Sequence, residues 1–209
     1  MTAENNFIIV IGRQFGCGGR RIGKKIAERL GVNCYDKDLI SEASQKNGFS
    51  PAVFAEADEK RPRFMGSVLQ SFFGVMDSYA GSPLSKEGLY KAQSETIRSI
   101  AEKENCVIVG RTADYVMRDH PGLLSIFLHA PIESRAKAIV ARGDAENEHD
   151  AISLAKKIDS TRENYYNFFT GRNWGYATNY HLTLDSSHLS DDMIVELIAN
   201  AVKTDLPAR

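Results

Sequence analysis

The chain has 209 residues, of which 43% are hydrophobic and 25% are charged, and this composition excludes a fibrous chain and one dominated by disorder. The 26 Lys and Arg residues and the 27 Asp and Glu residues give a formal net charge of −1, which argues against a protein that coats nucleic acid, because such proteins need a basic excess. The three widely spaced cysteines argue against a disulfide framework. No apolar run approaches the roughly 18 residues that span a membrane. We therefore expect a cytoplasmic protein.

The first half of the chain opens with a predicted buried strand at residues 7–11, an unbroken apolar run rich in β-branched side chains. A glycine-rich turn follows, and residues 20–30 carry the apolar spacing of a helix that stops at Gly31. Residues 32–35 form a short second strand, and residues 50–88, which are broken by prolines and glycines, are predicted to be an inserted helical region. A strand, a glycine turn and a helix in this order are typical of the opening of an α/β nucleotide-binding fold.

Helices and strands alternate in the second half of the chain. Helices are predicted at residues 85–103, 131–142, 150–169 and 190–203. Strands are predicted at residues 106–110, 123–128 and 180–184. Because parallel strands need helical crossovers between them, this alternation predicts an α/β fold with a parallel sheet in a single domain over residues 1–209.

Four glycines, Gly12, Gly16, Gly18 and Gly19, fall between the first strand and the first helix. Glycines let the backbone adopt a positive φ and approach a ligand closely, and the N-terminus of the following helix favours an anion. Between Gly12 and Leu30 the chain carries six basic residues and one acid, which strengthens the prediction of a phosphate site. The alternative is a tight turn followed by a solvated basic helix face.

This loop departs from the phosphate-binding motif G-x-x-x-x-G-K-S/T, in which the lysine reaches the β- and γ-phosphates and the hydroxyl helps to hold Mg²⁺. When the two are aligned on Gly18, Arg13 stands at the first glycine, Gly19 at the lysine and Arg20 at the hydroxyl residue. Arg20 or Arg21 could bind phosphate through a guanidinium. Neither can ligate a metal, so the metal ligands stay unknown.

Three blocks of the sequence resemble the cytidylate kinase-like family of bacterial P-loop proteins, within the nucleoside monophosphate kinases. The blocks are IIVIGRQFGCGGRRIGKKIAERLGVNCYDKDLI, CVIVGRTADYVMRDHPGLLSIFLHAPIESRAKAIV and IDSTRENYYNFFTGRNWGYATNYHLTLDSS. The resemblance implies a three-layer α/β/α P-loop fold with a five-stranded parallel sheet. It also implies a helical acceptor-binding insertion at residues 50–88, a lid region at 143–175, and the use of ATP with Mg²⁺.

The resemblance also implies residues that bind the acceptor. Cytidylate kinases carry a Gly-Arg-Asp segment that binds CMP; Gly110 and Arg111 match it, whereas Thr112 stands in place of the acid. Asp159 and Arg162 have the spacing of an Asp-x-x-Arg pair that contacts the monophosphate in that family. One helical turn separates these two side chains, so a local ion pair is the alternative.

Phosphoryl transfer needs positioning and charge neutralisation, which several arginines can supply. The predicted catalytic residues are Arg20, Arg111 and Arg162. The predicted ATP- and phosphate-binding residues are Gly16, Cys17, Gly18, Gly19, Arg20, Arg21, Arg135 and Arg142. The predicted acceptor-binding residues are Arg13, Asp36, Lys37, Arg111, Asp159 and Arg162.

The leading hypothesis is therefore an ATP-dependent kinase of a nucleoside monophosphate, with CMP or dCMP first. A kinase of a non-nucleotide small molecule is a close variant. The missing lysine and hydroxyl favour a catalytically silent nucleotide-binding sensor or regulator instead. A nucleic-acid-binding module built on the basic face at residues 13–29 is a third class, which the net charge disfavours. We expect small-molecule nucleotide partners, no nucleic acid or membrane partner, and a monomer or homodimer.

Overall fold

The computed structural model describes residues 7–36 and 86–203. Lys37 and nearly all of the predicted insertion at residues 50–88 lie outside the described residues. Five parallel strands form one sheet in the order β2-β3-β1-β4-β5. The strands are β1 (Ile8–Arg13), β2 (Asn33–Tyr35), β3 (Cys106–Val109), β4 (Leu123–His129) and β5 (Leu182–Asp185). The five-stranded parallel sheet predicted from the sequence is confirmed.

β1 lies at the centre of this sheet and pairs with β3 on one side and β4 on the other. Residues 8–11 are fully buried, because helices cover both faces of a parallel sheet and leave no polar side for the strand to expose. Since all five strands run the same way, their carboxyl ends meet at one edge. Arg13 ends β1 there, and Gly110 directly follows β3. That edge is where open α/β sheets bind their ligands.

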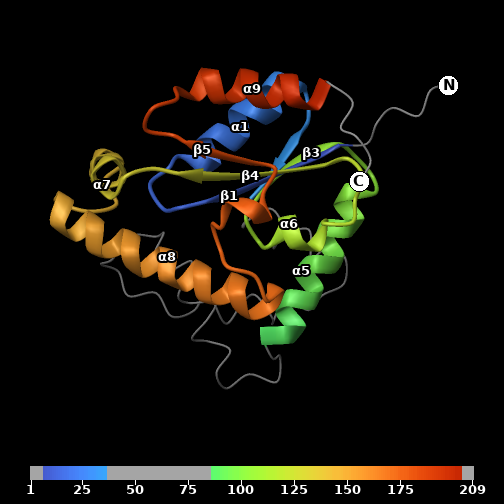
Figure 1. Ribbon diagram of the computed structural model, residues 1–209, viewed down its shortest axis with the longest axis horizontal. Coiled ribbons are helices and arrows are strands. Elements are labelled where there is room, and N and C mark those ends of the chain that lie inside the picture. Colours follow the sequence, from blue (N-terminus) through green and yellow to red (C-terminus); the bar gives the residue numbers. More distant parts are fainter. Residues whose placement is uncertain (1–6, 37–85, 204–209) are drawn as a thin grey trace.

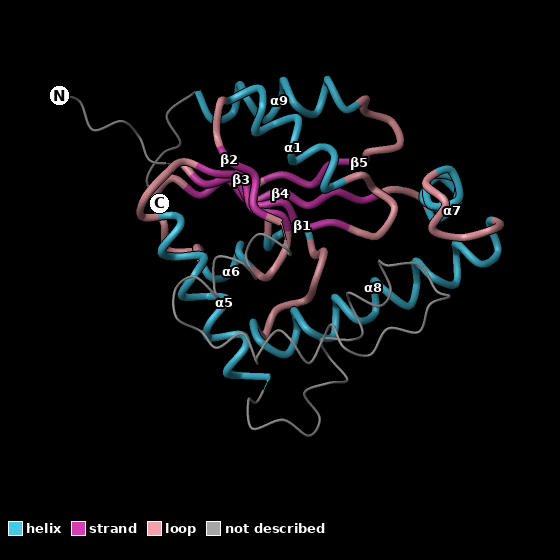
Figure 2. The backbone as a smooth tube through the Cα atoms, turned by 180° about the vertical axis from the view of Figure 1, so that it is seen from behind, coloured by secondary structure: helices cyan, strands magenta, loops and turns pink. Residues whose placement is uncertain are grey.

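Helices pack on both sides of the sheet. They are α1 (Gly19–Leu30), α5 (Lys86–Ala101), α6 (Ala113–Val116), α7 (Ile132–Ala141), α8 (Glu148–Thr170) and α9 (Asp191–Lys203). α1 and α9 cover one face, while α5, α6 and α8 lie on the opposite side (Figures 1 and 2). α6 was not predicted, because four residues are too few to show a helical period. Among the described helices, none is long and apolar enough to cross a membrane.

The basic face of α1 lies against acidic side chains of α9. The Lys25 ammonium is 3.1 Å from Asp192 Oδ1, and Arg29 Nε donates to Glu196 Oε1 at 2.6 Å. These pairs are exposed and contribute little stability each. They do neutralise much of the local basic excess, so the structure weakens the hypothesis that this face binds nucleic acid.

Gly23 lies in α1 where the helix contacts the sheet. A Cβ atom there would lie 2.8 Å from Val109 Cγ2, 3.5 Å from Cys34 Sγ and 3.5 Å from Ile11 Cδ1. Alanine favours a helix over glycine by about 1 kcal/mol, but overpacking a buried site costs about 1–3 kcal/mol. We therefore expect Gly23→Ala to lower the free energy of unfolding by about 1 kcal/mol in urea titrations. Glu28→Ala, on the exposed side of α1, should change it by less than about 0.5 kcal/mol; a stabilised Gly23→Ala protein would contradict this packing.

Candidate functional site

The glycine loop joins β1 to α1 at the carboxyl edge of the sheet. Gly16 (φ 94°) and Gly18 (φ 72°) adopt left-handed conformations, which L side chains rarely adopt. A Cβ atom at Gly16 would also lie 2.8 Å from the Cβ atom of Arg135. Gly18 is the N-cap of α1 and provides no capping side chain. The first N–H groups of a helix lack intrahelical partners, so this turn is built to receive an anion.

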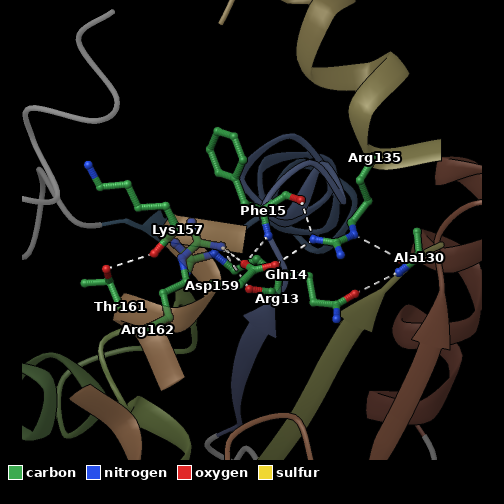
Figure 3. Close-up of polar contacts among 9 residues, drawn as sticks. All are labelled: Arg13, Gln14, Phe15, Ala130, Arg135, Lys157, Asp159, Thr161 and Arg162. Carbon is green, nitrogen blue, oxygen red and sulfur yellow. Dashed lines mark hydrogen bonds and ion pairs between the residues drawn. The ribbon is translucent and has the colours of Figure 1, made fainter. Parts of the chain in front are cut away.

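Two charged side chains from distant helices hold this loop in place (Figure 3). Asp159 Oδ1 on α8 accepts the Phe15 N–H at 2.7 Å. Arg135 Nη1 on α7 donates to Asp159 Oδ2 at 2.6 Å and to the Phe15 carbonyl at 3.2 Å, while its Nε donates to the Ala130 carbonyl at 3.0 Å. Burial raises the pKa of Asp159, and the Phe15 N–H and the guanidiniums of Arg162 and Arg135 oppose that rise. Both polar groups of the Phe15 backbone are thus fixed by one ion pair.

Arg162 lies one turn after Asp159 on α8. Its Nη1 donates to the Arg13 carbonyl at 3.0 Å and lies 3.6 Å from Asp159 Oδ1. Burial lowers the pKa of Arg162 to about 10, so it still carries its charge at neutral pH. The local ion pair that the spacing allowed is therefore formed, and Arg162 also reaches the end of β1.

Arg13 is the centre of the positive charge at this edge. Burial lowers its pKa well below the ordinary value, and the charges of Arg162, Arg111 and Arg20 lower it further. Within residues 7–36 and 86–203, no carboxylate forms an ion pair with the Arg13 guanidinium. The charged groups that most affect Arg13 are therefore other arginines.

Residues 110–112 form a strained turn directly after β3. Gly110 (φ 83°), Arg111 (φ 61°) and Thr112 (φ 52°) are left-handed in succession, although only the first is a glycine. Each such non-glycine residue costs about 1–3 kcal/mol, and such strain concentrates at functional sites. Arg111 Nη1 is 3.4 Å from Gln93 Oε1, and the Thr112 hydroxyl donates to the Arg111 carbonyl at 2.6 Å. The turn holds Arg111 at the same edge as Arg13.

The remaining predicted arginines have different positions. Arg20, in the first turn of α1, forms an ion pair of 2.8 Å with Asp36, which directly follows β2. Arg21 forms an ion pair with Asp191 of α9. Arg142 donates to Asp144 Oδ2 at 2.5 Å (Nη2) and 2.9 Å (Nε) on the surface. The structure therefore gathers Arg13, Arg20, Arg111 and Arg162, whereas Arg135 anchors the loop. Arg21 and Arg142 also reach the loop beside their ion pairs: Arg21 Nη2 lies 2.7 Å from where a Cβ atom of Gly18 would be, and the Arg142 guanidinium lies 5.2 Å from the centre of the Phe15 ring.

Cys17 lies within the glycine loop but is buried. Burial raises its pKa to about 11, so the thiol is protonated at neutral pH. A neutral side chain cannot add charge to a phosphate site, and the Cys17 N–H donates to the Gln14 carbonyl at 3.5 Å within the loop.

The sequence profile of the cytidylate kinase-like family matches residues 8–188. The chain belongs to this family. Among curated relatives it is 22% identical to a cytidylate kinase from Pyrococcus horikoshii over 200 residues, covering 95% of this chain and 90% of that protein. It is 28% identical to a cytidylate kinase from Thermococcus kodakarensis over 102 residues, covering 49% of this chain and 51% of that protein.

Solved structures share the fold of this cytidylate kinase-like chain. An uncharacterized protein from Eubacterium ventriosum is 27% identical with a TM-score of 0.72, and the match covers 95% of this chain and 99% of that one. A gluconokinase from Sinorhizobium meliloti has a TM-score of 0.55 at 14% identity, covering 96% and 94%. A shikimate kinase from Bacteroides thetaiotaomicron has a TM-score of 0.54 at 13% identity, covering 94% and 98%. The family supports a kinase that transfers phosphoryl groups, and these structures show that the fold is shared.

Membership of a kinase family implies ATP, for which Mg²⁺ is the usual companion. The glycine loop and the arginines suit the phosphates. The loop does not offer the usual hydroxyl ligand for Mg²⁺, because Arg20 stands at that position and is paired with Asp36. In the part of the chain that is described, no group of three or more His, Cys, Asp or Glu side chains could hold a metal ion.

Sequence reasoning missed two interactions that shape the site of this cytidylate kinase-like chain. The Tyr166 hydroxyl donates to Asp114 Oδ2 at 2.8 Å, which fixes α6 and the strained turn against α8. Gln14 Oε1 accepts the Ala130 N–H at 3.2 Å and ties the glycine loop to β4. Asp114 follows the Gly-Arg pair closely in the sequence, but no signal in the sequence pairs it with Tyr166. Nothing in the sequence indicates the role of Gln14.

Proposed function

We propose that this chain transfers the γ-phosphoryl group of ATP to a small phosphate-bearing acceptor, with a nucleoside monophosphate, CMP or dCMP, as the first candidate. The observation that carries the proposal is the cluster of Arg13, Arg20, Arg111 and Arg162 at the carboxyl edge of the sheet, where Arg13 has no carboxylate partner among the described residues. A polyanion is the ligand that satisfies this charge. The family and the fold support a kinase as its user.

The reaction needs little covalent chemistry from the protein. An oxygen of the acceptor phosphate bonds to the γ-phosphorus while the bond to the β,γ-bridging oxygen breaks, and ADP leaves with that oxygen. The acceptor oxygen is already anionic, so no general base is required. Arg20, Arg111 and Arg162 are proposed to neutralise the charge that builds up on the transferring group. Asp159 is proposed to act by positioning, because its carboxylate holds the loop and Arg135.

The identity of the acceptor depends on the residues near the strained turn. In cytidylate kinases, which this chain resembles, the Gly-Arg-Asp segment that binds CMP has an acid where this chain has Thr112. Here the Thr112 hydroxyl is buried and donates to the Arg111 carbonyl, so it is engaged within the turn. The residues of this site therefore support recognition of the acceptor's phosphate better than recognition of any particular base.

The test is ADP release from ATP and Mg²⁺ with each nucleoside monophosphate, with shikimate, with gluconate, and with buffer alone. Stimulation by a nucleoside monophosphate supports the proposal and names the substrate. Stimulation by shikimate or gluconate alone would keep the kinase and replace the acceptor. No stimulation, with ATP still raising the melting temperature, would favour the silent nucleotide-binding protein, which the absent lysine and hydroxyl also favour.

A further inference from the structure

We propose that Arg13 and Gly19 have exchanged the roles that their positions have in a standard phosphate-binding loop: Arg13 supplies the phosphate-binding cation from the end of β1, and Gly19 makes room for it. The inference rests on the proposed function, because it deepens the account of the same site. It assigns to Arg13 a contact with the phosphates of the nucleotide, whereas the sequence predicted a contact with the acceptor.

The first observation is a reciprocal departure from the motif. In G-x-x-x-x-G-K-S/T the strand-end position is glycine and the residue after the last glycine is lysine. This chain has arginine at the first of these positions, Arg13, and glycine at the second, Gly19. If the motif's glycine and its lysine had simply been lost independently, there would be no reason to find an arginine at position 13 together with a glycine at position 19. An exchange predicts both.

The second observation is steric. A Cβ atom at Gly19 would lie 2.8 Å from Arg13 Cγ, 3.3 Å from Cδ and 3.2 Å from Cβ. The stem of Arg13 therefore fills the space from which a lysine at position 19 would start. On its other side, a Cβ atom at Gly110 would overlap Arg13 Nη1 and lie 3.0 Å from Cζ. Arg13 thus runs between two glycine backbones: a side chain at position 19 would meet the stem of Arg13, and one at position 110 would meet the far end of its guanidinium.

The third observation is electrostatic. The Arg13 backbone is fixed by its pairing with Leu128 and by the bond from Arg162 Nη1 to its carbonyl, so the guanidinium projects from a rigid strand end. Its charged neighbours are mainly arginines, and no described carboxylate forms an ion pair with it. A guanidinium binds phosphate oxygens in bidentate fashion. A phosphate chain lying on the glycine loop supplies negative charge to this guanidinium.

A double-mutant cycle tests the exchange with Arg13→Gly, Gly19→Lys and the variant that carries both changes and restores the standard order. Affinity for ATP and for inorganic tripolyphosphate is measured by calorimetry, and turnover by ADP release. Each single change should weaken binding of both probes by about tenfold or more. The double variant should bind both at least about tenfold more tightly than either single variant. If its loss instead equals the product of the two single losses, the exchange is wrong.

A ligand-free measurement guards against variants that fold poorly. Gly19→Ala adds only the Cβ atom that would meet Arg13. It should lower the free energy of unfolding in the wild-type background and be nearly neutral beside Arg13→Gly, and equal effects in both backgrounds would overturn the steric argument. Arg13→Lys should retain more binding than Arg13→Gly, because it keeps the charge.

The same measurements separate this inference from the proposed reaction. A wild-type protein that binds tripolyphosphate but phosphorylates no acceptor would refute the reaction, and the tripolyphosphate affinities of the variants would then decide the exchange. Turnover that survives Arg13→Gly unchanged would refute the exchange alone. A wild-type protein that binds neither probe would overturn both.

Discussion

Replacing Arg111 by alanine should lower kcat/KM for phosphoryl transfer by about 100-fold or more, because a guanidinium aimed at a transferring phosphoryl group contributes several kcal/mol to transition-state stabilisation. The turn that holds Arg111 keeps it at the edge of the sheet in a left-handed conformation, φ 61°. Arg111→Lys should be intermediate, because lysine keeps the charge but not the bidentate geometry. Steady-state ADP release with the identified acceptor measures all three proteins.

Arg111→Gly separates catalysis from structure. Glycine adopts a positive φ without strain. The free energy of unfolding of Arg111→Gly should therefore be at least as high as that of Arg111→Ala. Its loss of activity should be the same. Arg118→Ala removes an arginine that is exposed and lies outside the cluster, and its activity should stay within about twofold of wild type. If Arg111→Ala and Arg20→Ala both retain nearly wild-type turnover, the arginine cluster is not the site of transfer.

The sheet could be predicted because its signals are local. Residues 8–11 form an apolar run that only a strand covered on both faces can use, and all of them are fully buried. α6 could not be predicted, because its four residues are held by the bond between Asp114 and Tyr166 across 52 positions of sequence. No local pattern carries information about a contact of that separation.

The contacts of the site likewise fall into those that local spacing predicts and those between positions far apart in the sequence. The contact between Asp159 and Arg162 follows from their spacing of one helical turn. The contact between Asp159 and the Phe15 N–H joins positions 144 residues apart, so the sequence alone could not show that this carboxylate anchors the loop. Arg13 and Gly19 were each visible as departures from a motif. Only the structure shows that a side chain at position 19 would overlap the stem of Arg13.

Replacing Asp159 by alanine should lower the free energy of unfolding by about 3–5 kcal/mol, because it leaves a buried cation without its partner. The side chains of Arg135 and Asp159 are 9% and 14% exposed, and their contact is 2.6 Å long. Asp144→Ala is the matched control: it removes a carboxylate from Arg142, whose side chain is 45% exposed, and should cost about 1 kcal/mol or less. Urea unfolding of the two variants beside wild type measures the difference, and equal losses would contradict the assignment.

A paired replacement distinguishes stability from loop positioning. Exchanging Asp159 for leucine and Arg135 for methionine together removes both charges, and apolar replacement of a buried pair is often close to neutral for stability. The double variant should therefore be more stable than Asp159→Ala. Its affinity for ATP should still fall by about tenfold, because neither new side chain can bond to the Phe15 backbone and the loop is no longer held in its binding conformation. Recovery of both stability and affinity would show that the ion pair fills space and does not position the loop.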